Sequence, residues 1–213
     1  MHRRILILGA ILAMASGSGA AADADSQRYF TYNPPRATEN RERIEITEFF
    51  WYGCGHCYRL DPFIQSWLKK LPKDVVFRRV PAVFPGRDGA PGSWAPGAKL
   101  YYSLEALGLL DKLHGDVFDA MHKDRVNLNN EKVMFEWLAK KGVDATKFSE
   151  VYNSFAIQAK VSRAMQLTES HGLDGVPVLI VDGRYRAPGD GEDALVLVDQ
   201  LIDKARKERM GRK

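Results

Sequence analysis

The 213-residue sequence contains only two cysteines, Cys54 and Cys57. Exported proteins that depend on disulfide staples carry several cysteines spread along the chain, so this count argues against a stapled scaffold. A bond between residues three apart would close a very small loop and remove little chain entropy. Stability is therefore a poor explanation for the pair.

The sequence also lacks a strong charge of either sign. The formal net charge is +4, and two of the basic side chains, Arg3 and Arg4, lie in a segment that we expect to be removed. The remaining chain would carry 29 basic and 27 acidic side chains, which is too small a surplus to indicate a nucleic-acid partner. The basic tail, residues 209–213, is expected to be a solvated helix end that suits the helix dipole, with a membrane- or partner-binding patch as the alternative.

Long apolar runs are absent except at the start. Ile5 to Ala15 is an apolar stretch of 11 residues, too short to span a bilayer. It follows the basic His2-Arg3-Arg4 and precedes small residues that end at Ala20-Ala21-Ala22. Residues 1–22 are therefore predicted to be a cleaved signal peptide, the alternative being an uncleaved anchor. Export would place the mature chain in an oxidising compartment.

The order of elements predicts the fold class. Apolar residues alternate through Arg43 to Phe50, which indicates a strand. After the cysteines, apolar residues recur at helical spacing, which indicates a helix, and a kink is expected where this helix contains Pro62. A second strand is expected over 75–83, and a hairpin with an Asp182-Gly183 type I′ turn over 177–186. The Gly- and Pro-rich residues 86–97 interrupt the pattern, and helices are expected over 98–107, 111–123, 130–141, 145–154, 156–171 and 191–208. This order is typical of an α/β domain interrupted by an all-helical insertion.

The chemistry predicted by Cys54-Gly55-His56-Cys57 is thiol–disulfide exchange. The first cysteine would lie at a helix start, where free backbone N–H groups and the helix dipole favour its thiolate. A stabilised thiolate makes the disulfide a stronger oxidant. Cys54 is the candidate nucleophile and Cys57 the resolving partner, and His56 adds a favourable charge when it is protonated.

Other uses of the cysteine pair remain open at this point. Zinc usually needs four ligands, and the remaining histidines do not stand at a zinc spacing from the cysteines, so no metal is expected. These histidines are His56, His114, His122 and His171. A structural disulfide in an exported chaperone or binding module is an alternative from another class. An isomerase or reductase with the same fold is a second alternative, although such proteins usually dimerise and no separate dimerisation segment is present.

Gly175-Val176-Pro177 is the second informative stretch. Pro177 opens a run of branched apolar residues that reads as a buried strand, and proline belongs at such a strand start. A cis bond is compatible with this position, but only about 5–6% of X–Pro bonds are cis, so base rates favour trans.

Phe49 to Tyr58, together with the helical block and Gly175-Val176-Pro177, resembles the DsbA-like periplasmic thiol:disulfide interchange proteins of the thioredoxin superfamily. The resemblance covers about residues 27–208. It implies a thioredoxin-like domain with an inserted all-helical domain, divided as 23–85 with the cysteine motif, 86–158 for the insertion and 159–208 for the second part.

The resemblance also implies functional details. Pro177 would be cis and lie against Cys54, and the backbone of Val176 would hold a substrate segment like an added strand. Glu48 would be a buried acid near the site, although the sequence alone also allows Glu48 to be an exposed strand residue. The substrates would be exported proteins with free thiols, and a membrane quinone reductase of the DsbB type would reoxidise a monomeric enzyme that needs no cofactor beyond its disulfide. The dipeptide is Gly-His, as in protein disulfide isomerases, rather than Pro-His, which leaves the oxidising strength open.

Overall fold

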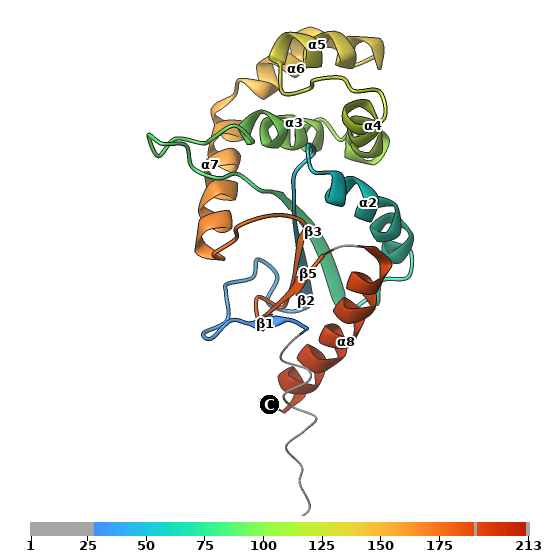
Figure 1. Cartoon of the computed structure of the whole chain (residues 1–213), viewed down its shortest axis with the longest axis vertical. Coiled ribbons are helices and arrows are strands. Elements are labelled where there is room, and N and C mark those ends of the chain that lie inside the picture. Colours follow the sequence, from blue (N-terminus) through green and yellow to red (C-terminus); the bar gives the residue numbers. More distant parts are fainter. Residues whose placement is uncertain (1–27, 190, 212–213) are drawn as a thin grey trace, which may run out of the picture.

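The computed structural model describes residues 28–189 and 191–211, so the expected signal peptide lies outside the described residues. Its centre is a five-stranded sheet in the order β1-β5-β4-β2-β3 (Figure 1). The strands are β1 (Phe30–Thr31), β2 (Ile44–Phe50), β3 (Val75–Pro81), β4 (Val178–Val181) and β5 (Tyr185–Pro188). The two segments of the predicted α/β domain thus form one sheet, because β4 from the second segment pairs with β2 from the first.

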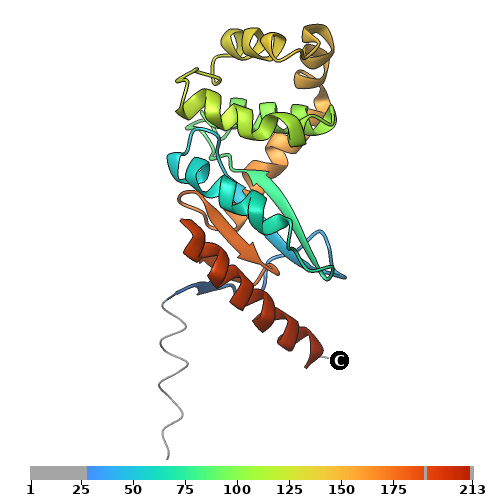
Figure 2. The same ribbon diagram turned by 90° about the vertical axis from the view of Figure 1, so that its right-hand side faces the viewer.

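Strand β2 lies inside the sheet and carries the chain toward the cysteine motif. It pairs parallel with β3 and antiparallel with β4, and all seven of its residues are buried. The helices α2 (Gly55–Leu68) and α8 (Gly191–Met210) cover one face of the sheet, and α7 (Phe155–Ser170) covers the other (Figures 1 and 2). The predicted strand is confirmed, and because both of its faces are covered, its polar residues are buried together with its apolar ones.

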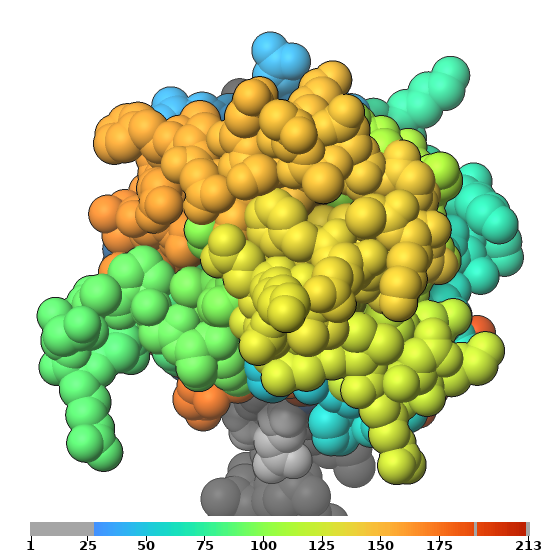
Figure 3. Space-filling model, turned by 90° about the horizontal axis from the view of Figure 1, so that it is seen from above, coloured from blue at the N-terminus to red at the C-terminus, as the bar shows by residue number. Residues whose placement is uncertain are grey.

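The helical insertion forms one end of the molecule (Figures 1 and 3). It contains α3 (Ala95–Ala106), α4 (Leu110–His122), α5 (Glu131–Lys140) and α6 (Ala145–Tyr152). The helix starts follow from side-chain caps, since the side chains of Asn130, Asp144 and Ser154 accept hydrogen bonds from backbone N–H groups of the first turns of α5, α6 and α7. Helix α7 runs without a break through residue 158, so the expected division between insertion and second segment falls inside a helix.

The structure differs from the sequence prediction in two places. No strand was predicted before residue 43, but Phe30–Thr31 pairs with β5 at the sheet edge. Helix α8 continues to Met210, two residues beyond the expected end, and Arg209 forms an ion pair with Asp182 instead of being only solvated. The Asp182-Gly183 turn has φ values of 55° and 62°, which confirms the type I′ turn.

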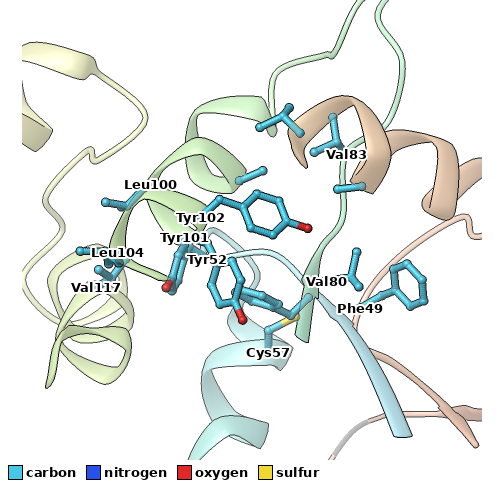
Figure 4. Close-up of a cluster of buried hydrophobic side chains, with 14 of the residues drawn as sticks. Phe49, Tyr52, Cys57, Val80, Val83, Leu100, Tyr101, Tyr102, Leu104 and Val117 are labelled. Atoms are coloured by element: carbon cyan, nitrogen blue, oxygen red, sulfur yellow. The ribbon is translucent and has the colours of Figure 1, made fainter. Parts of the chain in front are cut away.

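One large cluster of buried side chains joins the sheet to the insertion. Figure 4 shows part of it, with Phe49 and Val80 from the strands, Cys57 from α2 and Leu104 from α3. The cysteine motif therefore lies where the two parts of the protein share one core. Among the described residues, no helix has the length and apolar character needed to cross a membrane.

Phe148→Ala tests the packing of the insertion. Phe148 is 1% exposed and packs against Phe135 and Tyr152, so its truncation should reduce the free energy of unfolding by about 3–5 kcal/mol. Phe155→Ala is the matched control, because Phe155 is 86% exposed and its loss should change stability by no more than about 0.5 kcal/mol. Urea denaturation measures both, and equal losses would contradict this description of the core.

Candidate active site

Cys54 is the N-cap of helix α2, directly after strand β2. Its φ and ψ of −88° and 117° are those of a cap residue, and its Sγ accepts a hydrogen bond from the backbone N–H of Cys57 with an N–S distance of 3.4 Å. The N–H of Cys54 donates to the carbonyl of Trp51, at 3.0 Å, which closes a turn just before the helix. The strand-to-helix junction thus presents the Cys54 sulfur to the free N–H groups of the first helical turn.

The two sulfurs occupy different environments. Both cysteines are free thiols in this structure, with Cys54 half-buried and Cys57 fully buried. The pKa of Cys54 is lowered from 9.0 to about 6. The hydrogen bond from the Cys57 thiol is the largest cause, burial opposes it, and the backbone N–H groups of Cys57 and His56 and the charge of His56 add to the lowering. Burial raises the pKa of Cys57 well above its usual range, with the adjacent Cys54 and the charge of Glu48 adding to the rise. Cys54 is therefore the thiol of the pair that ionises more readily.

The loop before β4 faces the Cys54 sulfur. The Val176–Pro177 peptide bond is cis, which reverses the base-rate expectation and agrees with the resemblance. The Cys54 thiol donates a hydrogen bond to the carbonyl oxygen of Val176, at 3.4 Å, so residues 122 positions apart meet at the nucleophile. His56, Val176 and Pro177 also line one open cleft of about 700 Å³, with Phe30 and Arg186 on its wall.

His56 lies on the exposed side of the first turn of α2. Its Nδ1 is 2.9 Å from Nη2 of Arg59, and because a guanidinium only donates, Nδ1 accepts this hydrogen bond. The charge of His56 is the smallest of the effects that lower the pKa of Cys54. The structure thus places His56 beside the nucleophile and adds Arg59, which the sequence analysis did not single out.

Glu48 lies inside the sheet and is 1% exposed, as the resemblance implied. Its Oε2 accepts a hydrogen bond from Nε of Arg79, at 2.9 Å, and Nη2 of Arg79 donates to Oδ1 of Asp61, at 2.8 Å. Burial raises the pKa of Glu48 to about 7, although the charge of Arg79 lowers it. For Asp61 burial also raises the pKa, but hydrogen bonding from His114 and the charge of Arg79 leave it below its usual value. Two carboxyl groups and one guanidinium thus form a buried charged cluster on the Cys57 side of the site.

Helix α4 extends this cluster to the residues before Cys54. Nε2 of His114 lies 3.3 Å from Oδ1 of Asp61, and Nδ1 of His114 lies 2.8 Å from the hydroxyl of Tyr52. Burial raises the pKa of Tyr52 well above its usual value, so the hydroxyl keeps its proton and donates to Nδ1. The proton of the neutral imidazole is then on Nε2, facing Asp61.

The Trp51 indole has two close neighbours. It stacks on Trp94 with ring centroids 4.4 Å apart and an angle of 3° between the planes. It also lies against Gly53, where any β-carbon would overlap the indole. Gly53 is therefore required by the close approach of the Trp51 side chain.

Sequence reasoning found the residues that are close in the chain and missed those that approach from elsewhere. The structure brings together Cys54, Cys57, His56, Val176 and Pro177, with Glu48 buried behind them. The missed residues come from β3, α2 and the insertion: Arg59, Asp61, Arg79, Trp94, His114 and His122. A charged residue within an otherwise apolar strand, such as Arg79 beside Val80, is the one signal that could have indicated a buried ion pair.

A low-pKa cysteine at a helix start, a buried partner thiol and a cis-proline loop on a thioredoxin-like sheet define a protein thiol–disulfide oxidoreductase. Residues 45–202 match the DSBA-like thioredoxin domain family, and the chain belongs to that family.

Relatives and solved structures agree with this assignment. The chain is 41% identical to the thiol:disulfide interchange protein DsbA of Pseudomonas aeruginosa, over 95% of this chain and 97% of that protein. It is 40% identical to the protein of the same name from Bordetella parapertussis, over 96% and 97% of the two chains. The crystal structure of Pseudomonas aeruginosa DsbA superposes with a TM-score of 0.79 at 38% identity, covering 86% of this chain and 94% of that one. The oxidoreductase DsbA from Xylella fastidiosa gives 0.76 at 30% identity, covering 84% and 96%.

Glu48→Gln tests the buried acid through the pH dependence of stability. The folded-state pKa of Glu48 is raised from 4.5 to about 7, so its contribution is fully present below about pH 4.5 and is lost as the pH rises through about 7. Glutamine cannot ionise, so the free energy of unfolding of the variant, relative to wild type, should rise by up to about 3 kcal/mol between pH 4.5 and pH 8.

The measurement is urea unfolding of both disulfide-bonded proteins across this pH range, which removes the titration of the thiols. Glu136→Gln is the control for the substitution itself, because Glu136 is exposed on α5. A pH-independent difference for Glu48→Gln would contradict a raised pKa at Glu48.

Proposed function

We propose that this oxidoreductase introduces disulfide bonds into exported proteins by exchange through Cys54 and Cys57. The observation that carries the proposal is the contrast between the two thiols, since the pKa of Cys54 falls to about 6 while that of Cys57 is raised. A cysteine with this pKa is mostly thiolate at neutral pH, and stabilisation of the thiolate favours the reduced form of the enzyme. An enzyme whose reduced form is favoured gives up its disulfide readily, which is the property of an oxidant.

The exchange then runs in two steps. A substrate thiolate attacks the sulfur of Cys54 in the enzyme disulfide, the Cys54–Cys57 bond breaks, and the Cys57 sulfur takes up a proton as it leaves. A second substrate thiolate attacks the substrate sulfur of the mixed disulfide, which releases Cys54 as a thiolate. The substrate loses two electrons and gains a disulfide, while the enzyme becomes a thiolate and a buried thiol. Cys54 is a good leaving group because of its low pKa.

The cis-proline loop supports the binding of an extended substrate segment. The carbonyl of Val176 points at the Cys54 sulfur, 3.4 Å away, so a peptide whose cysteine reaches this sulfur also comes within reach of the Val176 backbone. The cleft of about 700 Å³ continues from there past Pro177 toward Phe30. Backbone hydrogen bonds to Val176 would hold many different sequences, as an enzyme with unfolded substrates requires.

The cycle requires reoxidation. Each turnover leaves two electrons on Cys54 and Cys57, and the pair needs no other cofactor. We assign their removal to a membrane quinone reductase of the DsbB type, and we place the mature monomer in the periplasm after removal of residues 1–22. The predicted signal peptide and the membership of the family support this part of the proposal.

The alternative is an isomerase or reductase that is kept reduced. The Gly-His dipeptide between the cysteines favours this alternative, because disulfide isomerases carry the same pair. Equilibration of the wild-type protein with glutathione buffers distinguishes the two functions. We expect a reduction potential well above that of thioredoxin, about −270 mV, because of the low pKa of Cys54. A potential near or below that value would favour a reductant.

Single cysteine variants test the assigned roles. Cys54→Ser should abolish disulfide formation in a reduced substrate protein, because the attacked sulfur is gone. In Cys57→Ala the Cys54 thiolate can still attack a disulfide of a substrate protein, releasing one substrate sulfur as a thiolate, but the neighbouring thiol that could break the resulting mixed disulfide is absent. Mixed disulfides through Cys54 should therefore accumulate in cells. Non-reducing electrophoresis detects these adducts, and the double variant Cys54→Ser/Cys57→Ala is the control that should show none. Full activity of Cys54→Ser would exclude the proposed chemistry.

A further inference from the structure

Helix α4 of the insertion lies beside helix α2, which begins at the cysteine motif (Figures 1 and 2). Nε2 of His122 lies 2.7 Å from the carbonyl oxygen of Tyr52, two residues before Cys54. A carbonyl oxygen only accepts, so the imidazole N–H donates this hydrogen bond. The same ring stacks on Tyr58, the residue after Cys57, with centroids 4.9 Å apart and an angle of 9°. One side chain thus links the segment before the motif to the helix after it.

The peptide unit held by His122 lies in the turn that presents the nucleophile. This turn runs from Trp51 to Cys54 and is closed by the hydrogen bond from the Cys54 N–H to the Trp51 carbonyl. Its central residues are Tyr52 and Gly53. The Tyr52 side chain is buried and Gly53 lies against the Trp51 ring, while the carbonyl between them is held by the hydrogen bond from His122. This hydrogen bond is thus a direct contact on the peptide unit at the centre of the turn.

The position of the Cys54 sulfur is sensitive to the orientation of this peptide unit. The sulfur accepts from the Cys57 N–H over 3.4 Å, and this hydrogen bond depends on the direction of the N–H as well as on its distance from the sulfur. A rotation of the turn would also move the sulfur relative to Val176 on the other side. The N–H of His122 on α4 thus affects how the Cys54 sulfur lies relative to the backbone N–H of Cys57, which favours the thiolate.

We infer that His122 is a positioning residue for the nucleophile: its N–H fixes the Tyr52 carbonyl and so holds the Cys54 sulfur against the N–H groups at the start of α2. The inference rests on the proposed role of Cys54 as the reactive cysteine. It gives the helical insertion a part in setting the reactivity of the site, because His122 and Asp119, which accepts a 2.9 Å hydrogen bond from the Tyr58 hydroxyl, both belong to α4.

Two substitutions separate the donor from the ring. His122→Phe keeps an aromatic ring for stacking on Tyr58 and loses the donor, whereas His122→Gln keeps an N–H donor and loses the ring. The Cys54 thiolate is titrated through the rate of alkylation by iodoacetamide between pH 4 and pH 9, in the full-length mature protein. The reduction potential in glutathione buffers is the second readout.

If the donor positions Cys54, His122→Phe should raise the thiol pKa by about one unit, which at pH 6 lowers the thiolate fraction and the alkylation rate about fivefold. Its potential should become more reducing, and His122→Gln should stay close to wild type in both readouts. Equal effects of the two variants would show that the ring and its packing matter instead, and wild-type behaviour of His122→Phe would show that the donor has no role. Either result overturns the inference.

Folding of the variants is followed by urea unfolding, and His122→Leu is a second variant without a donor should His122→Phe fail to fold. The proposed function fails in a different way, if Cys54→Ser keeps activity or if wild-type Cys54 titrates as an ordinary thiol. Failure of the inference leaves both of those results unchanged.

Discussion

The chemistry of this protein depends on one contact, the hydrogen bonding of the Cys54 sulfur at the start of helix α2. The sulfur is an N-cap, so the helix supplies donors that a thiolate can use and a disulfide cannot. Each other feature of the site either places Cys54 at this helix start or keeps its partner thiol protonated. Strand β2 ends just before the segment that leads to Cys54, and the burial of Cys57 raises its pKa above that of Cys54.

The surroundings of this contact come from three parts of the chain. The cis-proline loop approaches from the second segment of the thioredoxin-like domain, and the charged cluster of Glu48, Arg79 and Asp61 lies within the first. The insertion supplies the rings and donors that hold residues 51–58, through Trp94, His114 and His122. The insertion therefore contributes side chains that contact the residues around the cysteine motif, and the thioredoxin-like domain alone lacks these contacts.

Much of this arrangement could be predicted from the sequence, for physical reasons that also explain the failures. The junction of strand and helix at Cys54 is encoded locally, by apolar periodicity on both sides of the motif. Strand β1 was missed because two residues carry no periodicity. Glu45 and Glu48 of β2 are buried in ion pairs with arginines of β3, and the residues of β2 alone do not indicate these partners. The contacts of His114 and His122 join residues more than sixty positions apart, and a single sequence carries no signal for such pairings.

The insertion also has a consequence for the timing of folding. The carbonyl that faces Cys54 belongs to Val176, 122 positions later, and β2 acquires its neighbour β4 only from that same late segment. A chain that is made or exported from its N-terminus exposes both cysteines long before the residues that complete the site emerge. The disulfide-exchange site can therefore assemble only after nearly the whole chain is available, so an incomplete chain carries the cysteine motif without the cis-proline loop that would complete it.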